Sequence, residues 1–283
     1  MHILKIAAFS EGGAGGNPAG VLVTPDALGD AEMLSIAAGL GFSETAFAVP
    51  TATEWRVRYF SPEAEVPFCG HATIALGAAL ARAHGDGVFP LALNNAKITV
   101  EGRHANGLMT AALQSPPTRS SAAPERLVSE VLELFGYSRD DLNPRLAPGL
   151  AHGGSDHLVL CLKSRARLAA MKYDFESGGT LMRREGFATI SLLHAQGPQL
   201  FHSRNPFAFG GVYEDPATGA AAAALAGYLR DIDWPHDGCI DIIQGEDMGM
   251  RSRIKAEFTS VAASSIRVSG AARMIDEAGQ TPH

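Results

Sequence analysis

The chain has 283 residues, of which 46% are hydrophobic and 19% charged, a composition typical of a globular protein with one large domain or two of ordinary size. The formal net charge is −7 and no run of lysine and arginine is long enough to follow a phosphate backbone, which argues against a nucleic-acid partner. No stretch reaches the roughly 18 apolar residues that a membrane span requires, so we expect no membrane association. Three cysteines cannot all pair, which favours a reducing, cytoplasmic compartment.

Hydrophobic periodicity predicts a mixed α/β chain. In the first part, strands are expected at 3–9 and 55–60, a strand end at 47–49, a helix at 30–40 with Asp30 as its N-cap, and a helix at 74–84. In the second part, the pattern predicts a helix over 127–135, strands near 158–162, 188–193 and 200–203, a helix at 219–229, and strands near 240–243, 254–258 and 266–268. The helices at 74–84 and 219–229 consist almost wholly of small apolar residues, so each should lie inside a domain.

One segment, residues 114–124, is rich in proline and serine and has no periodicity. It predicts a boundary between an N-terminal domain, 1–117, and a C-terminal domain, 118–269. The C-terminal residues, from about 270 to 283, are expected to pack back onto the first domain.

The two parts are similar to each other. When residues 65–72 are laid over residues 214–221, an offset of 149 residues (219 minus 70), the pattern E-x-P-x-x-G-x-A coincides. Alanine-rich helices produce chance matches further along, but the residues before the helix are harder to match by accident. The sequence therefore predicts an internal duplication.

Each copy of the pattern opens a helix with glycine, followed by His71 in the first copy and Ala220 in the second. A helix N-terminus has unpaired backbone N–H groups and a partial positive charge, so two such termini, at Gly70 and Gly219, are suited to a small carboxylate. The alternative interpretation is structural: Asp215 caps the second helix, and the proline after it is the first helical residue.

Four side chains near these helices could carry chemistry: Glu44, Cys69, His71 and Asp215. The field of the helix should lower the pKa of His71 and keep it neutral, and Glu44, flanked by apolar residues at the start of a strand, is suited to general acid/base work. The alternatives are a solvated histidine at a helix end and a carboxylate that faces solvent. Cys69 could be activated by the helix start, but its repeat equivalent is Thr218, so a racemase mechanism with two opposed thiols is not available.

The remaining signals are weaker. Asn17 lies in a glycine-rich turn, residues 12–18, from which it could reach a ligand. Cys161 and Cys239 have no partner at metal-ligand spacing, so both are predicted to be buried structural thiols, and no metal motif is present.

Five segments, taken in order, resemble the PhzF-type phenazine-biosynthesis family, which has the diaminopimelate epimerase-like fold. They are residues 16–21 (GNPAGV), 43–47 (SETAF), 58–73 (RYFSP leading to EVPFCGHAT), 214–219 (EDPATG), and 244–246 (QGE) with 251–252 (RS). They span nearly the whole chain, and five together are highly specific.

The resemblance implies two similar α/β (α+β) domains, each a curved sheet or small barrel around a central helix, with the active site in the cleft between them. It assigns proton transfer to Glu44 and places His71 and Asp215 in the same site. Substrate contacts are expected from Asn17, Ser43, Gly70, Thr73, Gly219 and Ala220. The family resemblance further implies a homodimer that uses no cofactor and no metal.

One departure concerns the second helix. The family pattern after its first glycine is Ser-Ala-His or similar, whereas this chain has three alanines, 220–222. We therefore expect a cofactor-independent isomerase that moves a proton on a small carboxylic acid, without assuming the phenazine precursor as its substrate. The alternatives are a racemase or epimerase of an amino or hydroxy acid, and a non-catalytic binding protein of the same fold.

Overall fold

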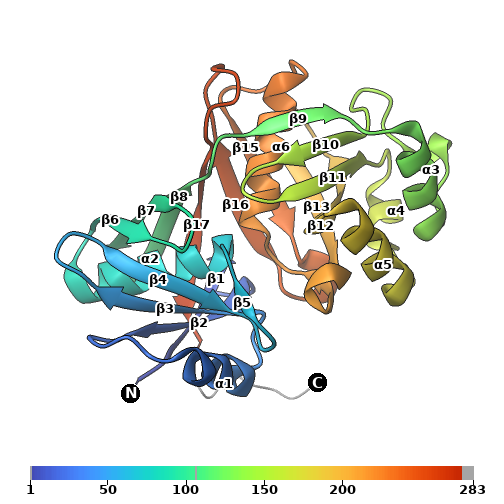
Figure 1. Cartoon of the computed structure of the whole chain (residues 1–283). Coiled ribbons are helices and arrows are strands. Elements are labelled where there is room, and N and C mark those ends of the chain that lie inside the picture. Colours follow the sequence, from blue (N-terminus) through green and yellow to red (C-terminus); the bar gives the residue numbers. More distant parts are fainter. Residues whose placement is uncertain (1, 106, 276–283) are drawn as a thin grey trace. The chain divides into compact units, whose positions relative to one another are not determined.

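The computed structural model describes residues 2–105 and 107–275, which divide into two compact units. Unit 1 contains the chain up to Gln114 and the segment that begins at Ser269, and unit 2 contains Ser115–Val268 (Figure 1). The predicted boundary after residue 117, and the return of the chain from about residue 270, lie close to this division; residues 276–283 lie outside the described residues. None of the helices in the described ranges is long and apolar enough to cross a membrane.

Unit 1 is built from strands that surround one helix. Its elements are β1 (Leu4–Ser10), β2 (Asn17–Val23), α1 (Asp30–Leu40), β3 (Glu44–Pro50), β4 (Trp55–Phe60), β5 (Glu65–Val66), α2 (Gly70–His84), β6 (Gly87–Ala92), β7 (Lys97–Ala105), β8 (Leu108–Gln114) and most of β17 (Arg267–Met274). Strand pairing runs β1–β2–β3–β4–β6–β7–β8–β17, and β17 pairs with β1 again. The strands therefore form a closed ring, and nearly all of α2 is buried inside it (Figure 1).

The close fit of α2 explains its small residues. A Cβ atom added to Gly102 of β7 would lie 2.1 Å from the carbonyl oxygen of Gly77 in α2, and one added to Gly77 would lie 2.5 Å from Val100. Backbone approaches backbone at this point, so only glycine fits. The helix is apolar all round because strands contact it on every side, as the sequence predicts.

Unit 2 repeats this arrangement. Its elements are β9 (Arg119–Ala122), α3 (Glu125–Leu134), β10 (Gly149–His152), β11 (Asp156–Cys161), α4 (Arg165–Ala169), α5 (Phe175–Glu185), β12 (Thr189–Ala195), β13 (Leu200–Phe207), β14 (Val212–Asp215), α6 (Gly219–Asp231), β15 (Cys239–Gln244) and β16 (Ser252–Glu257). The pairings β10–β11, β11–β12, β12–β13, β13–β15 and β15–β16 alternate between antiparallel and parallel in the order seen for β1 to β7. The topology thus supports the predicted duplication, with α6 equivalent to α2.

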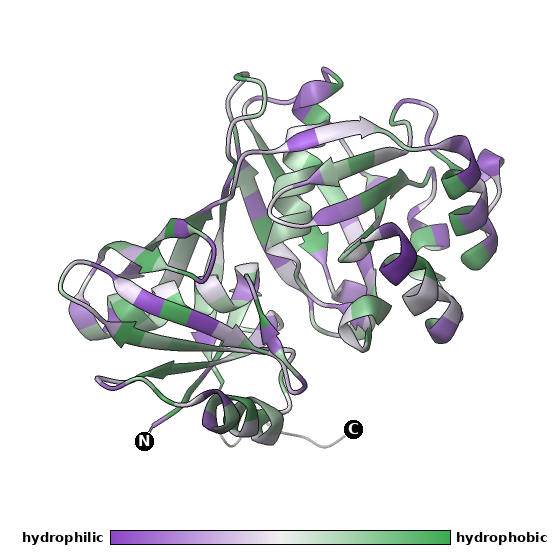
Figure 2. Cartoon of the chain, in the orientation of Figure 1, coloured by the Kyte–Doolittle hydropathy of each residue, from purple (hydrophilic) through white to green (hydrophobic). Residues whose placement is uncertain are grey.

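A separate hydrophobic core lies between the strands of unit 2 and its outer helices. It includes Leu127, Val131, Leu160 and Met182, all nearly inaccessible to solvent. Hydrophilic residues of this unit gather on α3, α4 and α5, whereas α6 is almost entirely apolar (Figure 2).

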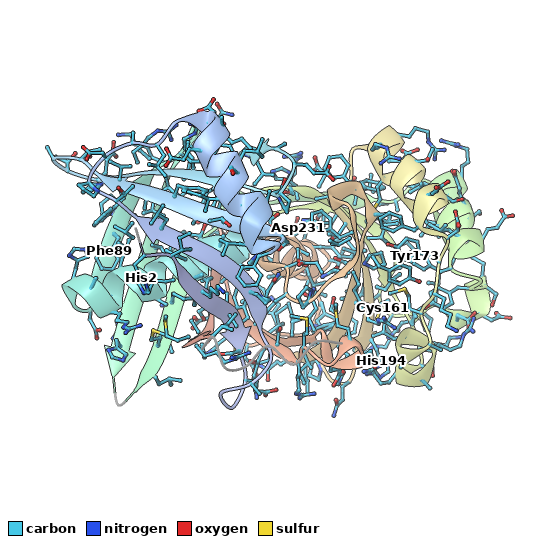
Figure 3. The ribbon with its side chains drawn as sticks, turned by 90° about the horizontal axis from the view of Figure 1, so that it is seen from below. His2, Phe89, Cys161, Tyr173, His194 and Asp231 are labelled. Atoms are coloured by element: carbon cyan, nitrogen blue, oxygen red, sulfur yellow. The ribbon has the colours of Figure 1, made fainter. Side chains whose placement is uncertain are left out.

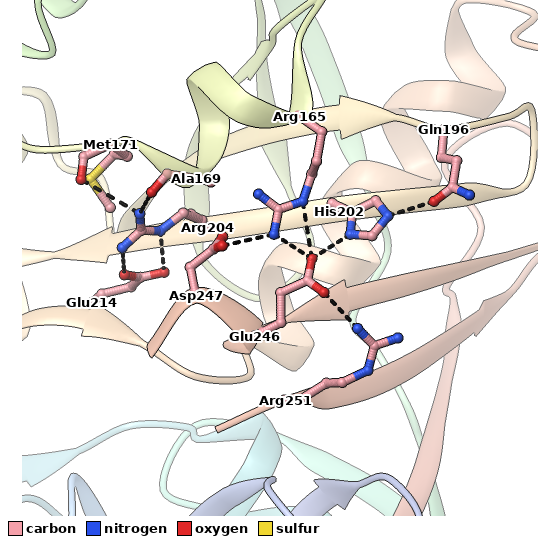
Figure 4. A network of polar contacts seen from close by, with 10 residues as sticks. All are labelled: Arg165, Ala169, Met171, Gln196, His202, Arg204, Glu214, Glu246, Asp247 and Arg251. Carbon is pink, nitrogen blue, oxygen red and sulfur yellow. Dashed lines mark hydrogen bonds and ion pairs between the residues drawn. The ribbon is translucent and has the colours of Figure 1, made fainter. Parts of the chain in front are cut away.

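Both units have the same ion pair beside the central helix. Arg58 of β4 donates two hydrogen bonds to Glu65 of β5, at 2.8 and 2.5 Å. Arg204 of β13 donates to Glu214 of β14 in the same two-bond geometry, at 3.0 and 2.5 Å (Figure 4). The repeated glutamate of the E-x-P-x-x-G-x-A pattern is therefore a structural residue that holds the short strand before each helix.

Several local predictions need correction. Gly29, not Asp30, is the N-cap of α1, and Asp30 instead forms an ion pair with Arg58. The alternative interpretation of Asp215 as the cap of α6 is also wrong, because β14 ends at Asp215 and Thr218 is the N-cap. Cys161, labelled in Figure 3, is buried as predicted, and burial raises its pKa to about 11. Cys239 is only half-buried, so the prediction for that thiol is wrong.

We predict that Gly102→Ala destabilises the protein by about 1–3 kcal/mol, because the new methyl group overlaps the backbone of α2. The matched control is Gly87→Ala. Gly87 pairs with Gly102 in the sheet, but its Cβ would meet only Phe89, at 3.6 Å. Urea unfolding should leave the control within about 0.5 kcal/mol of the wild type. Equal effects of the two substitutions would contradict the close fit of the ring around α2.

A buried histidine makes the stability of the protein depend on pH. His157 in β11 is 1% exposed, and its Nδ1 atom lies 2.8 Å from Thr189 Oγ1. Burial lowers its pKa to about 4, an effect that Asp156 opposes and His152 reinforces. As the pH falls from about 6.5 to 4, the unfolded chain takes up this proton before the folded chain does, so the folded state loses on the order of 3 kcal/mol.

His157→Asn tests this prediction because asparagine can still contact Thr189 but does not titrate. Urea unfolding at pH 7 and pH 4 should show a smaller loss of stability in the variant than in the wild type. The same loss in both proteins would show that His157 already takes up its proton freely in the folded state.

Candidate functional site

Three polar side chains meet at the N-terminus of α2 in unit 1. Glu44 is the first residue of β3, which follows the left-handed Gly41 that ends α1. Cys69 is the N-cap of α2, and His71 is its second residue. Parallel pairing of β2 with β3 fixes the position of Glu44 in the ring that surrounds the helix.

The contacts among these residues are close. Nε2 of His71 lies 3.5 Å from Oε2 of Glu44 and 3.3 Å from the hydroxyl of Ser43. Nδ1 of the same ring lies 3.3 Å from the sulfur of Cys69. Among the described residues, Oε2 of Glu44 is buried without accepting a hydrogen bond, because the 3.5 Å contact with His71 does not meet hydrogen-bond geometry. The predicted alternative of a solvent-facing carboxylate is therefore wrong, since Glu44 is only 8% exposed.

Burial determines the charge of the histidine. Desolvation lowers the pKa of His71 below its ordinary value, and the nearby Glu44 carboxylate opposes this effect only in part. The sequence also predicts a lowered pKa for His71, but with the field of the helix as its cause, whereas burial is the main cause. The neutral imidazole can accept or donate a proton beside the Glu44 carboxylate.

Of the predicted contact residues in unit 1, Ser43 has its hydroxyl against the ring of His71, and Gly70 is the first residue of α2. Thr73 is fully buried; its hydroxyl donates to the Cys69 carbonyl at 2.7 Å and lies 2.6 Å from the hydroxyl of Tyr59. Thr73 therefore supports the first turn of the helix, and its contact with substrate stays a prediction.

Asn17 belongs to unit 1 but not to the turn in which it was predicted. It is the first residue of β2, it pairs with Ala8 of β1, and it is 2% exposed. Its contact with a ligand also stays a prediction.

The corresponding helix start in unit 2 carries a different polar group. The Thr218 hydroxyl donates to the Asp215 carboxylate at 2.5 Å. Gln244, at the end of β15, donates to the carbonyl of Asp215 at 2.7 Å and accepts from the N–H of Thr218 at 3.2 Å. Gly219 and Ala220 are the first two residues of α6.

Gln244 lies in the QGE segment of the family resemblance, and the sequence pattern predicts no role for it. It is 1% exposed and joins β15 to the segment that opens α6. The next residues of that loop, Glu246 and Asp247, bind Arg165, and Glu246 also binds His202 and Arg251 (Figure 4). The only sequence signal for this cluster is the QGE run together with the RS pair that follows it.

The structure shows how the two helix starts differ. Thr218 is the N-cap where unit 1 has Cys69, and Ala220 stands where unit 1 has His71. The first residue of β12, equivalent in topology to Glu44, is Thr189. The cluster of thiol, imidazole and carboxylate therefore belongs to unit 1, whereas Asp215 belongs to unit 2.

Comparison with known proteins finds relatives that match nearly the whole chain. The sequence profile of the family described as "Phenazine biosynthesis-like protein" matches residues 6–278. A protein named "uncharacterized isomerase YddE" from Escherichia coli O157:H7 is 28% identical over 91% of this chain and 90% of its own length. The trans-2,3-dihydro-3-hydroxyanthranilate isomerase of Pseudomonas chlororaphis is 30% identical over 95% of each chain.

The fold has a close match among solved structures. A phenazine biosynthesis protein of the PhzF family from Bacillus anthracis superposes with a TM-score of 0.84 at 22% identity, over 98% of each chain. Both sequence relatives above are named isomerases, which confirms the predicted enzyme class. Because the family profile covers nearly the whole chain, the protein belongs to the phenazine biosynthesis-like family and has its diaminopimelate epimerase-like fold.

Proposed function

We propose that this protein is a cofactor-independent isomerase that moves a proton on a small carboxylic acid, with Glu44 as general base and then general acid. The observation that carries the proposal is the Oε2 atom of Glu44, which is buried and accepts no hydrogen bond within the described ranges, residues 2–105 and 107–275. A buried carboxylate oxygen without a partner is costly to maintain. A substrate that brings a proton to this oxygen would supply the missing partner.

His71 and the helix start complete the proposed site in unit 1. The neutral ring of His71 contacts Glu44 and Ser43, so it can polarise the substrate or hold it against the carboxylate. Backbone N–H groups at Gly70 and His71 have no partner within α2 and are suited to a substrate carboxylate. Asn17, Ser43 and Thr73 are proposed as further substrate contacts or supports.

Unit 2 is proposed to contribute Asp215 and the start of α6. Asp215 would position the substrate, and the backbone N–H groups of Gly219 and Ala220 would donate to it. Gln244 and Thr218 hold Asp215 in a defined orientation, which is what a positioning carboxylate needs.

The difference between the two units favours an isomerase with a single acid/base over a racemase whose two bases occupy equivalent positions of the two units. A two-base racemase needs a proton carrier on each face of its substrate. Unit 1 offers Glu44, but the equivalent position in unit 2 is Thr189, and the equivalent of Cys69 is Thr218. Neither threonine hydroxyl is an effective base near neutral pH.

The names of the relatives indicate a class of substrate and not one particular substrate. One relative is named for its action on trans-2,3-dihydro-3-hydroxyanthranilate, a small cyclic acid. Residues 220–222 of this chain are all alanine, so the start of α6 presents backbone groups without the hydroxyl and imidazole of the family pattern. We propose a small carboxylate that differs from that acid. The same three alanines favour the second candidate, a non-catalytic binding protein of this fold. A homodimer and a cytoplasmic location remain parts of the proposal.

We predict that Glu44→Gln abolishes most turnover but preserves binding. A positioned acid/base contributes roughly 10²–10⁴ in rate, so the variant should lose that factor in kcat. The assay incubates the protein with a panel of small amino, hydroxy and cyclic unsaturated acids in deuterated water and measures incorporation by mass spectrometry. Any acid that binds should still raise the thermal unfolding temperature of the variant.

The matched control is Glu32→Gln, which removes an exposed carboxylate from α1 of the same unit and should leave turnover unchanged. Normal turnover by Glu44→Gln would refute the assignment of the base. Deuterium incorporation with inversion at the α-carbon would identify a racemase instead. Stabilisation by an acid without any incorporation in the wild type would identify a binding protein.

A further inference from the structure

The Glu44 cluster has the composition of a metal site as well as of an acid/base site. Ligand atoms from Glu44, Cys69 and His71, all buried, lie within 4.8 Å of one another, and this is the one such group of three found within the described ranges. A carboxylate, an imidazole and a thiolate are the three ligand types that proteins use for zinc. We propose that Glu44, Cys69 and His71 bind one Zn²⁺ ion, which blocks the Glu44 carboxylate.

The two ligand-to-ligand distances that involve His71 fit zinc with little movement, and all three ligand atoms lie within 4.8 Å of one another. Zinc lies about 2.3 Å from sulfur and about 2.0–2.1 Å from nitrogen or oxygen, so tetrahedral geometry places ligand sulfur and nitrogen about 3.6 Å apart and nitrogen and oxygen about 3.4 Å apart. Here Nε2 of His71 lies 3.9 Å from the Cys69 sulfur and 3.5 Å from Oε2 of Glu44. The imidazole therefore binds through Nε2, with the other two ligands on either side.

The charges also balance. Zinc binding releases the Cys69 thiol proton to solvent, and the resulting thiolate and the Glu44 carboxylate together carry two negative charges. These cancel the charge of the ion, and His71 binds as a neutral ligand. A neutral assembly avoids the cost of burying net charge, and it gives the unpartnered Oε2 atom of Glu44 a partner.

The ligand set distinguishes zinc from the common hard cations. Mg²⁺ and Ca²⁺ bind through oxygen atoms and at higher coordination numbers, which one carboxylate beside a thiol and an imidazole does not provide. Three protein ligands leave a fourth position open, where water or a substrate carboxylate could bind. The bound ion would coordinate the Glu44 carboxylate oxygen that the proposed reaction uses as its base, so we infer that zinc inhibits the enzyme. This inhibition rests on the proposed function, whereas the binding itself does not.

The experiment measures Zn²⁺ binding to untagged, metal-free protein by competition with a chromophoric chelator. We expect one ion per chain in the wild type. Replacing residues next to metal ligands typically weakens binding 10–100-fold, so loss of a ligand in Cys69→Ser or Glu44→Gln should weaken it by more than about 100-fold. The control Cys239→Ser removes a half-buried thiol in unit 2 and should bind zinc as the wild type does. Mg²⁺ in excess should not compete.

A second measurement needs no variant. Co²⁺ bound to the wild-type protein should show a sulfur-to-metal charge-transfer band, which Zn²⁺ displaces. Absence of that band, or equal zinc affinity in the wild type and in Cys69→Ser, would overturn the proposal. Zinc should also suppress deuterium incorporation in the isomerase assay. If Glu44→Gln turns over normally while the wild type still binds one zinc ion through Cys69, the proposed function fails and the metal site stands.

Discussion

The structure depends on enclosing a helix completely within a ring of strands. A helix in this position buries nearly all of its side chains, so small apolar residues predominate in it, and it must approach the surrounding backbone closely. Gly77 and Gly102 show the consequence, since an added Cβ atom has no space between α2 and β7. The backbone donors at the N-terminus of such a helix have no partner in the helix itself. The enclosure that makes most of α2 apolar therefore concentrates polar side chains and free backbone donors at its first turn.

The duplication separates what the fold needs from what the chemistry needs. Both units keep the paired arginine and glutamate, Arg58 with Glu65 and Arg204 with Glu214, and both central helices form the same first hydrogen bond, back to the residue before the helix. The side chains of the first turn differ between the units. Structural positions are alike in the two halves, whereas the positions that we propose to face a substrate differ. The proposed reaction accordingly relies on one acid/base in unit 1.

The sequence predicted the elements whose pattern is local. The alternation in 55–60 defines β4 as observed, and the small apolar run predicts α2 and α6. It missed β6, where Pro90 argues against a strand, and α5, where Gly178 and Gly179 lower helix propensity. In α5 tertiary packing decides, because Leu181 and Met182 belong to the buried hydrophobic core of unit 2. Such contacts between distant residues leave no periodic signal.

The same limit applies to the candidate site. Apolar neighbours identified Glu44 as the start of a strand, and the glycine before His71 identified a helix start. That the two side chains lie 3.5 Å apart follows only from the way β3 joins the ring around α2, which no local pattern encodes. Their closeness has a chemical consequence. A carboxylate kept without a hydrogen-bond donor is ready to accept a proton, and for the same reason it is ready to bind a cation. Beside a thiol and a neutral imidazole, the arrangement that favours proton transfer therefore also favours capture of zinc.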